Sequence, residues 1–156
     1  MPYHEAIIDL IKFILLRGKE FVSLIDSGNA YDKILRNYHQ FNIKGEKVYR
    51  NKKLMQRHYR FSENAWLNKN DIDKLYFEHL YPVKLIKREL NELNTIDNEN
   101  IKRIIDKTEI IVILKDESKK IDAVYKDDIP QNGKNRLEFF DIKIHFETKN
   151  NNLFKV

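Results

Sequence analysis

The first third of the chain has the hydrophobic spacing of amphipathic helices. Between residues 3 and 16, five apolar residues recur at steps that place them on one helical face: Ile7, Ile8, Ile11, Ile14 and Leu15. This spacing predicts a helix over 3–16, and Gly18 marks its end. A helical pattern resumes near residue 19 and again at Ala30, with Ser27-Gly28-Asn29 between the two stretches. We therefore expect two more helices here.

The middle of the chain predicts a loop or hairpin, then a short helix and a strand. Residues 41–60 contain Gly45 and alternate polar with apolar residues, which is typical of a basic hairpin or an ordered loop. Ser62 is suited to cap a short helix containing Trp66. Residues 75–79 predict a strand, and we expect Tyr76 to pack with Trp66 in the core.

The second half alternates helical and strand patterns. Helical spacing follows Pro82 over 83–93, and Asp97 is a good N-cap for a helix that continues through Ile105. The β-branched run 109–114 predicts a buried strand. Shorter segments complete the pattern: a helix over 116–122 capped by Asp116, a loop over 127–133, a helical turn over 136–140, and a strand over 142–146.

These elements predict an α+β fold with N-terminal helices followed by a small unit of strands and helices. The length of 156 residues suits one domain, 1–156, with a helical and basic portion at 1–60 and an α+β portion at 61–156. We expect the core of the second portion to include five residues: Phe77, Ile111, Ile113, Ile142 and Ile144.

Composition excludes several functional classes. The chain has no Cys, which removes thiol nucleophiles, disulfide scaffolds and Cys-based zinc sites, and which fits a cytoplasmic, reducing location. With only four Gly, it has no Gly-rich phosphate loop and no Gly-flanked serine nucleophile. No apolar run resembles a signal peptide or a membrane span, so we expect no membrane association.

The net charge of +5 is concentrated in one segment. Residues 1–60 carry 12 Lys and Arg against 6 Asp and Glu, whereas residues 61–156 carry 17 against 18. We define residues 44–60 as the basic segment, in which cations alternate with Tyr49 and Tyr59. This composition is typical of phosphate neutralisation and base stacking, although a solvated loop has it too. The predicted nucleic-acid contacts are Lys47, Arg50, Lys52, Lys53, Arg57 and Arg60, with Arg136 from a later loop.

A possible catalytic motif ends the predicted strand 75–79. In Glu78-His79-Leu80-Tyr81-Pro82, an acidic residue precedes a His that is followed three residues later by Pro. This resembles the first motif of the HNH, or His-Me finger, nucleases. The resemblance implies a ββα-metal site in which His79 is the general base and Glu78 helps hold a divalent metal, Mg²⁺ or Mn²⁺. It also implies a ββα-like core made of 75–79, 109–114 and 116–122, with helices inserted between the two strands.

The chain departs from this family in its metal helix. HNH proteins usually carry a His there, whereas 115–122 has none. A carboxylate is the candidate substitute, with Glu117 first and Asp116 or Asp122 next. The departure leaves open a scaffold without nuclease activity, or a His79 that only hydrogen-bonds to the backbone beside a solvated Glu78. A competing arrangement combines Asp122 with Asp141 and Lys143, as in another nuclease fold, although a polar edge strand has the same pattern.

The leading hypothesis is a protein that acts on nucleic acid, with DNA as the expected partner and a metal-dependent endonuclease activity that requires His79. The alternative is a non-catalytic module that binds nucleic acid or protein, for example in conflict between a phage and its host. A third hypothesis is an interaction module in which the helix over 3–16 supplies a homodimer face.

Overall fold

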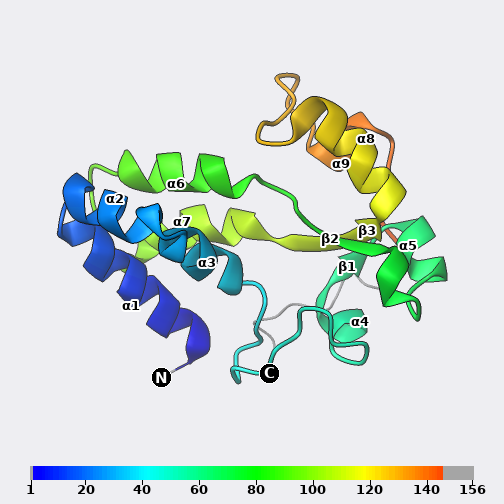
Figure 1. The fold of residues 1–156 in the computed structure, drawn as a ribbon, viewed down its shortest axis with the longest axis horizontal. Coiled ribbons are helices and arrows are strands. Elements are labelled where there is room, and N and C mark those ends of the chain that lie inside the picture. Colours follow the sequence, from blue (N-terminus) through cyan, green and yellow to red (C-terminus); the bar gives the residue numbers. More distant parts are fainter. Residues whose placement is uncertain (1, 146–156) are drawn as a thin grey trace.

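The computed structural model describes residues 2–145 and has the predicted α+β architecture (Figure 1). Three strands form one sheet in the order β1-β3-β2: β1 (Arg60–Phe61), β2 (Leu75–His79) and β3 (Ile110–Leu114). β1 runs parallel to β3, and β2 runs antiparallel to it, so that His79 pairs with Ile110 at one end. β2 is therefore an edge strand whose outer side faces no other strand in this sheet.

One group of helices packs around its own hydrophobic core. We call it the helical group: α1 (Tyr3–Leu16), α2 (Lys19–Ser27), α3 (Ala30–Asn37), α6 (Val83–Asn91) and α7 (Asn98–Ile105). α6 and α7 belong to it because they bury residues such as Ile86 and Ile101 against α1 and α3. The packing therefore does not follow the predicted division at residue 60. None of the helices within residues 2–145 combines the length and the apolar character that crossing a bilayer requires.

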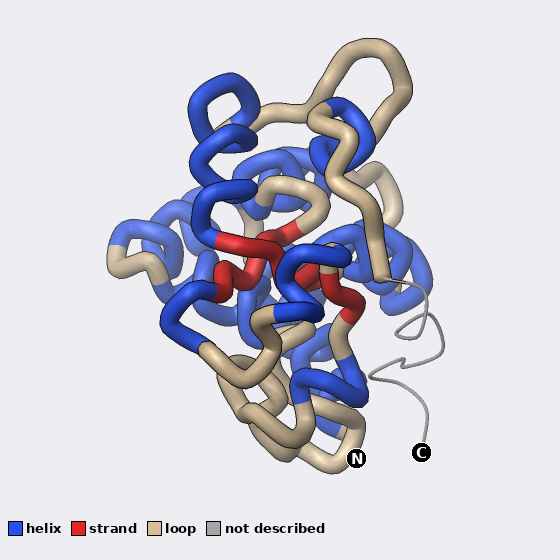
Figure 2. Tube along the Cα trace, turned by 90° about the vertical axis from the view of Figure 1, so that its right-hand side faces the viewer, coloured by secondary structure: helices blue, strands red, loops and turns tan. Residues whose placement is uncertain are grey.

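Two further layers lie against the sheet (Figure 2), and alternate residues of its strands pack against one or the other. Phe77 and Val112 point to the layer made by the basic segment, α4 (Met55–His58) and α5 (Glu63–Leu67). Ile111 and Ile113 point to the other layer, made by α8 (Lys115–Tyr125) and α9 (Arg136–Phe139). Two 3₁₀ turns, η1 (Ile72–Lys74) and η2 (Asp106–Thr108), precede β2 and β3. The predicted order of two antiparallel strands and a helix, with helices inserted between the strands, is confirmed.

The predicted caps Ser62 and Asp97 are confirmed, whereas the predicted cap Asp116 is wrong, because it lies in the first turn of α8 and Leu114 is the N-cap. Ser62 and Asp97 cap their helices through side-chain oxygens that accept from Ala65 N at 3.1 Å and Asn100 N at 2.8 Å. α8 begins at Lys115 and extends to Tyr125, beyond the predicted 116–122. The predicted strand 142–146 is absent within the described residues, where only an isolated bridge joins Ile144 to Ser62; its last residue lies outside them.

The basic segment is an ordered loop rather than a full hairpin. An isolated bridge joins Phe41 to Lys47 across a turn, in which Gly45 has a φ of 79° that favours glycine. The Asn42 side chain accepts from the backbone N–H groups of Lys44 and Glu46, each at 3.0 Å. Further along, three fully or nearly fully buried side chains anchor the loop: Val48, Met55 and Tyr59. The segment is thus fixed by its own turn and by the core of the sheet.

Candidate functional site: a cleft at the edge of the sheet

A cleft of about 530 Å³ lies along the free edge of β2, which we call the edge cleft. Its walls come from α3 and α6 of the helical group on one side and from α8 on the other. In Figure 1 these helices flank the strand. Because residues on both faces of an edge strand can reach its open side, Glu78 and His79 both line the cleft. The volume is within the range of about 300–1,000 Å³ that is usual for small-ligand sites.

His79 is held in one orientation by a backbone carbonyl. Its Nδ1 lies 2.9 Å from the carbonyl oxygen of Thr108, which can only accept, so Nδ1 carries the hydrogen and Nε2 is left as an acceptor. Burial is the main reason that the pKa of His79 is lowered to about 4, with Arg36 and Arg136 acting in the same direction. The ring is therefore neutral at pH 7. The hydrogen bond from His79 to the backbone, which the sequence offered as an alternative role, is present. It involves Nδ1 and not Nε2.

A second histidine, His39, forms a hydrogen bond with Thr108. His39 is buried, and its Nδ1 lies 2.7 Å from the Thr108 hydroxyl, which itself donates to the carbonyl oxygen of Ile105 at 2.8 Å. Nδ1 of His39 therefore also carries the hydrogen. Burial, together with the neighbouring His79 and His4, lowers the pKa of His39 to about 3. Thr108 thus joins two neutral imidazoles where the helical group meets the sheet.

Glu78 and Arg136 form a buried ion pair at the floor of the edge cleft. Glu78 is 5% exposed and Arg136 is 3% exposed. The guanidinium donates to Glu78 Oε1 and to three backbone carbonyl oxygens, those of His79, Tyr125 and Lys126. Burial raises the pKa of Glu78 to about 7, and the charge of Arg136 opposes that rise. Glu78 is therefore not a solvated charge. Arg136 is not the exposed phosphate ligand that the sequence predicted, because the guanidinium is buried and its two terminal nitrogens donate inside the protein.

Glu117 caps a helix and lies away from the edge cleft. Its Oε2 accepts from Ser62 Oγ at 2.7 Å and from Leu114 N at 2.8 Å, and its Oε1 accepts from Asn64 Nδ2 at 3.0 Å. Leu114 is at the opposite end of β3 from Ile110, the partner of His79, and four residues of strand span about 13 Å. The predicted placement of Glu117 beside His79 as a metal ligand is wrong, because the carboxylate serves the start of α8.

Asp122 is the one predicted metal ligand that is exposed in the edge cleft. Glu78 shares the cleft but is held by Arg136, and Glu117 is at the other end of the sheet. Mg²⁺ needs several oxygen ligands at about 2.0–2.1 Å in nearly octahedral geometry. The three carboxylates therefore do not fit the shared Mg²⁺ or Mn²⁺ ion that the resemblance implies.

The residues of the competing nuclease arrangement also lie in two different places. Asp141 and Lys143 line another cavity, together with Arg60 and Glu63, whereas Asp122 lines the edge cleft. Lys143 lies outside any strand, and its backbone carbonyl accepts from Glu63 N at 2.9 Å. The structure does not bring these three predicted residues to one place.

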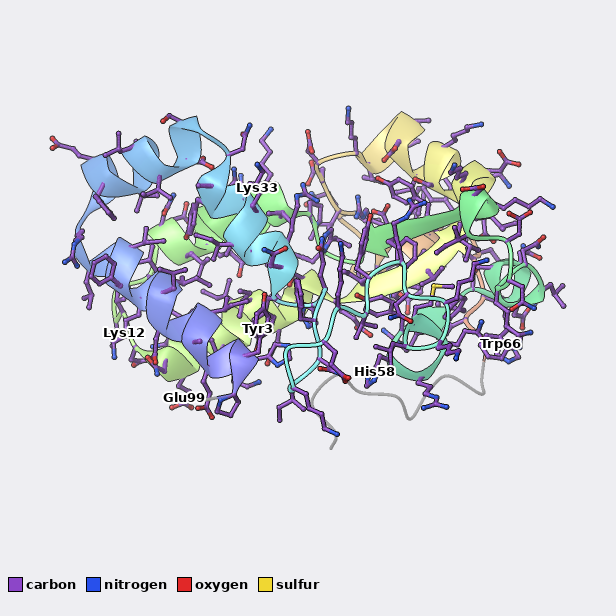
Figure 3. All side chains as sticks on the ribbon, turned by 60° about the horizontal axis from the view of Figure 1, so that its bottom comes forward. Tyr3, Lys12, Lys33, His58, Trp66 and Glu99 are labelled. Atoms are coloured by element: carbon purple, nitrogen blue, oxygen red, sulfur yellow. The ribbon has the colours of Figure 1, made fainter. Side chains whose placement is uncertain are left out.

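Five of the seven predicted nucleic-acid contacts are exposed: Lys47, Arg50, Lys52, Lys53 and Arg57. Within residues 2–145, no ion pair joins any of these five to an acidic side chain. Arg60 is different, because it donates twice to the carboxylate of Glu109 at 2.8 Å. In the view of Figure 3, His58 of this segment lies between Tyr3 of α1 and Trp66 of α5.

Sequence reasoning missed several residues of the edge cleft. Arg36 of α3 and Lys84 of α6 line it, Lys126 lines it just after the end of α8, and Tyr49 reaches it from the basic segment. Tyr76 was expected in the core but lines the cleft and is 41% exposed. No local pattern marks these positions, since only the packing of α3, α6 and α8 around β2 brings them together.

No protein-family model matches the chain, and comparisons with curated proteins and with solved structures find no match either.

Proposed function

We propose that this protein binds nucleic acid and that the basic segment supplies contacts to the phosphate backbone. The observation that carries the proposal is the group of five exposed cations, Lys47, Arg50, Lys52, Lys53 and Arg57, with no ion-pair partner within residues 2–145. Cations that are not neutralised by the protein are available to phosphates, and their binding releases counterions. DNA is the partner that we expect.

The order of the basic segment supports this proposal. The Asn51 side chain accepts from the backbone N–H groups of Lys53 and Leu54 at 3.2 and 3.1 Å, which fixes the backbone that carries the cations. Glu46, the acidic residue of this stretch, is occupied by Asn42, whose Nδ2 donates to it at 2.7 Å. A fixed backbone loses less conformational entropy on binding than a flexible loop. The segment therefore presents its charges at low entropic cost.

Salt dependence tests the proposal. We expect the affinity for a 20-nucleotide DNA to fall steeply with salt, with a slope of log K against log salt of roughly −3 to −5 for about five phosphate contacts. Replacing Lys52, Lys53 and Arg57 by Gln should reduce the size of that slope by about 2 to 3. Fluorescence anisotropy at several salt concentrations measures both values.

A matched variant controls for overall charge. Lys19, Lys33 and Lys115 are exposed outside the basic segment, and replacing them by Gln removes the same three charges. This control should keep most of the slope. Equal losses in both variants, or an affinity that does not change with salt, would contradict contacts through the basic segment.

A second candidate function, phosphodiester hydrolysis at His79, is favoured by the orientation of that ring. A neutral imidazole whose Nδ1–H is fixed by a carbonyl can accept a proton at Nε2. In this reaction Nε2 takes a proton from water while the water oxygen bonds to phosphorus. The bond from phosphorus to the leaving sugar oxygen then breaks, and that oxygen takes up a proton from solvent. Without hydrolysis, the same surface is a non-catalytic binding module.

Plasmid cleavage distinguishes these two functions. We expect His79→Asn, which keeps a donor to Thr108 but has no basic nitrogen, to abolish nicking and to leave DNA affinity unchanged. The assay is run with Mg²⁺, with Mn²⁺ and with a chelator. Nicking that persists in the variant would remove His79 from the reaction, and no nicking by the unmodified protein would leave the binding function alone.

A further inference from the structure

The edge cleft contains two tyrosines that the proposed function does not use. Tyr76 is 41% exposed on the face of β2 that also carries Glu78. Tyr49 is half-buried, with its ring centroid 4.6 Å from that of Phe77, and it belongs to the basic segment. Exposed aromatic rings beside cations are the usual platform on which unpaired bases stack. The basic segment and the edge cleft are therefore joined through Tyr49.

The charges of the edge cleft suit a ligand with both an anionic end and N–H donors. Lys84 of α6 and Lys126 beside α8 are exposed, and neither forms an ion pair within residues 2–145. The exposed carboxylates of Asp122 and Asp127 line the same space. A bare phosphate would be repelled by these carboxylates, whereas a nucleotide offers them the N–H groups of its base. The mixed lining thus favours a nucleotide unit over a simple anion.

We propose that the edge cleft takes one unpaired nucleotide of a single strand whose backbone lies on the basic segment. The base stacks on Tyr76, its N–H groups face Asp122, and its phosphate contacts Lys84 or Lys126. The proposal rests on the proposed nucleic-acid binding and adds the class of ligand. Bases in a duplex are stacked and paired, so a base enters a cleft of about 530 Å³ only when it is unpaired or flipped out.

The affinity difference between single-stranded and duplex DNA tests this inference. Fluorescein-labelled 20-nucleotide DNA is titrated with the full chain, as a single strand and as a duplex of the same sequence, at one salt concentration. We expect the single strand to bind at least tenfold more tightly. Tyr76→Ala should weaken single-strand binding by at least about fivefold, as expected for the loss of one stacked base, and should leave duplex binding unchanged.

Two further variants keep the result interpretable. Tyr76→Phe retains the ring and should retain the affinity for the single strand. Phe139→Ala removes an aromatic ring that is equally exposed, at 41%, but does not line the edge cleft, and it should change neither affinity. If Tyr76→Ala fails to fold by circular dichroism, the double variant Lys84→Gln with Lys126→Gln takes its place, with the same expected loss on the single strand.

The outcomes separate this inference from the proposed function. Equal affinity for single strand and duplex, or a Tyr76→Ala loss no larger than that of Phe139→Ala, would overturn the nucleotide site while DNA binding stands. Failure of both DNAs to bind at low salt would overturn the nucleic-acid function and this inference with it. Binding of the single strand that also requires Tyr76 supports both.

Discussion

Replacing Arg136 by Met tests the buried ion pair that forms the floor of the edge cleft. The substitution keeps a long apolar side chain but removes the donors to Glu78 and to three backbone carbonyl groups. Glu78, which is 5% exposed in the unmodified protein, then loses the cation that donates to its carboxylate. Breaking a buried pair by removing one partner costs about 3–5 kcal/mol, because the remaining carboxyl group must either stay charged without its partner or take up a proton. We expect the free energy of unfolding to fall by this amount at pH 7.5.

The pH dependence of this loss has a defined sign. The pKa of Glu78 is raised to about 7 in the native protein, so the folded state holds a proton that the unfolded chain has released. The resulting stability is present below the ordinary value of 4.5 and is lost as pH rises to the native pKa. Without Arg136 this pKa rises further, so the variant continues to lose stability above pH 7. The deficit should therefore grow by about 1 kcal/mol between pH 7 and pH 8.

Urea denaturation followed by circular dichroism measures these differences. Arg60→Met is the matched control, because Arg60 also pairs with a carboxylate, that of Glu109, but the two side chains are 33% and 40% exposed. Exposed pairs contribute about 0–1 kcal/mol. Adding Glu78→Gln to Arg136→Met removes the unpaired charge and should recover about half of the loss. A deficit no larger than that of Arg60→Met, or no recovery in the double variant, would refute the reasoning.

Two further predictions concern stability. Glu117→Ala leaves Ser62 Oγ and the backbone N–H of Leu114 without their acceptor, so the free energy of unfolding measured in urea should fall by about 2–3 kcal/mol. Replacing the exposed neighbour Asp116 by Ala should change it by no more than about 0.5 kcal/mol. Equal effects of the two substitutions would contradict the capping role of Glu117. The pKa of His39, lowered to about 3, means that the unfolded chain binds more protons below pH 6.5, so stability falls as pH decreases from that value. Between pH 7 and pH 5, wild type should lose about 2 kcal/mol more than His39→Asn, and equal losses would show that His39 is not buried and neutral.

Local patterns predict the elements of this fold well. The helix over 3–16 and the strand over 75–79 have the predicted bounds, because hydrophobic periodicity depends on residues close together in the chain. The capping roles of Ser62 and Asp97 follow from the same short range. The two-residue strand β1 has no such pattern, since pairing with β3 alone defines it.

The site depends on contacts between segments that are distant in the chain. The sequence did not predict the role of a residue correctly where such a contact decides that role. Glu117 is a cap because Ser62, 55 residues earlier, donates to it. Arg136 is buried because Glu78, 58 residues earlier, is its partner. In both cases the residue type was singled out correctly as important. The charge itself does not reveal whether it is satisfied inside the protein or offered to a ligand.

Mapping the bound surface by NMR tests most directly the claim that the basic segment and the edge cleft form one nucleic-acid-binding surface. A ¹⁵N-labelled full chain is titrated with a 12-nucleotide single-stranded DNA, and amide shifts are followed. We predict the largest shifts in residues 44–57, at the end of β2 near His79, and near Asp122 of α8, with little change in α1 and α2. Shifts concentrated in α1 and α2, or none at low salt, would contradict the account.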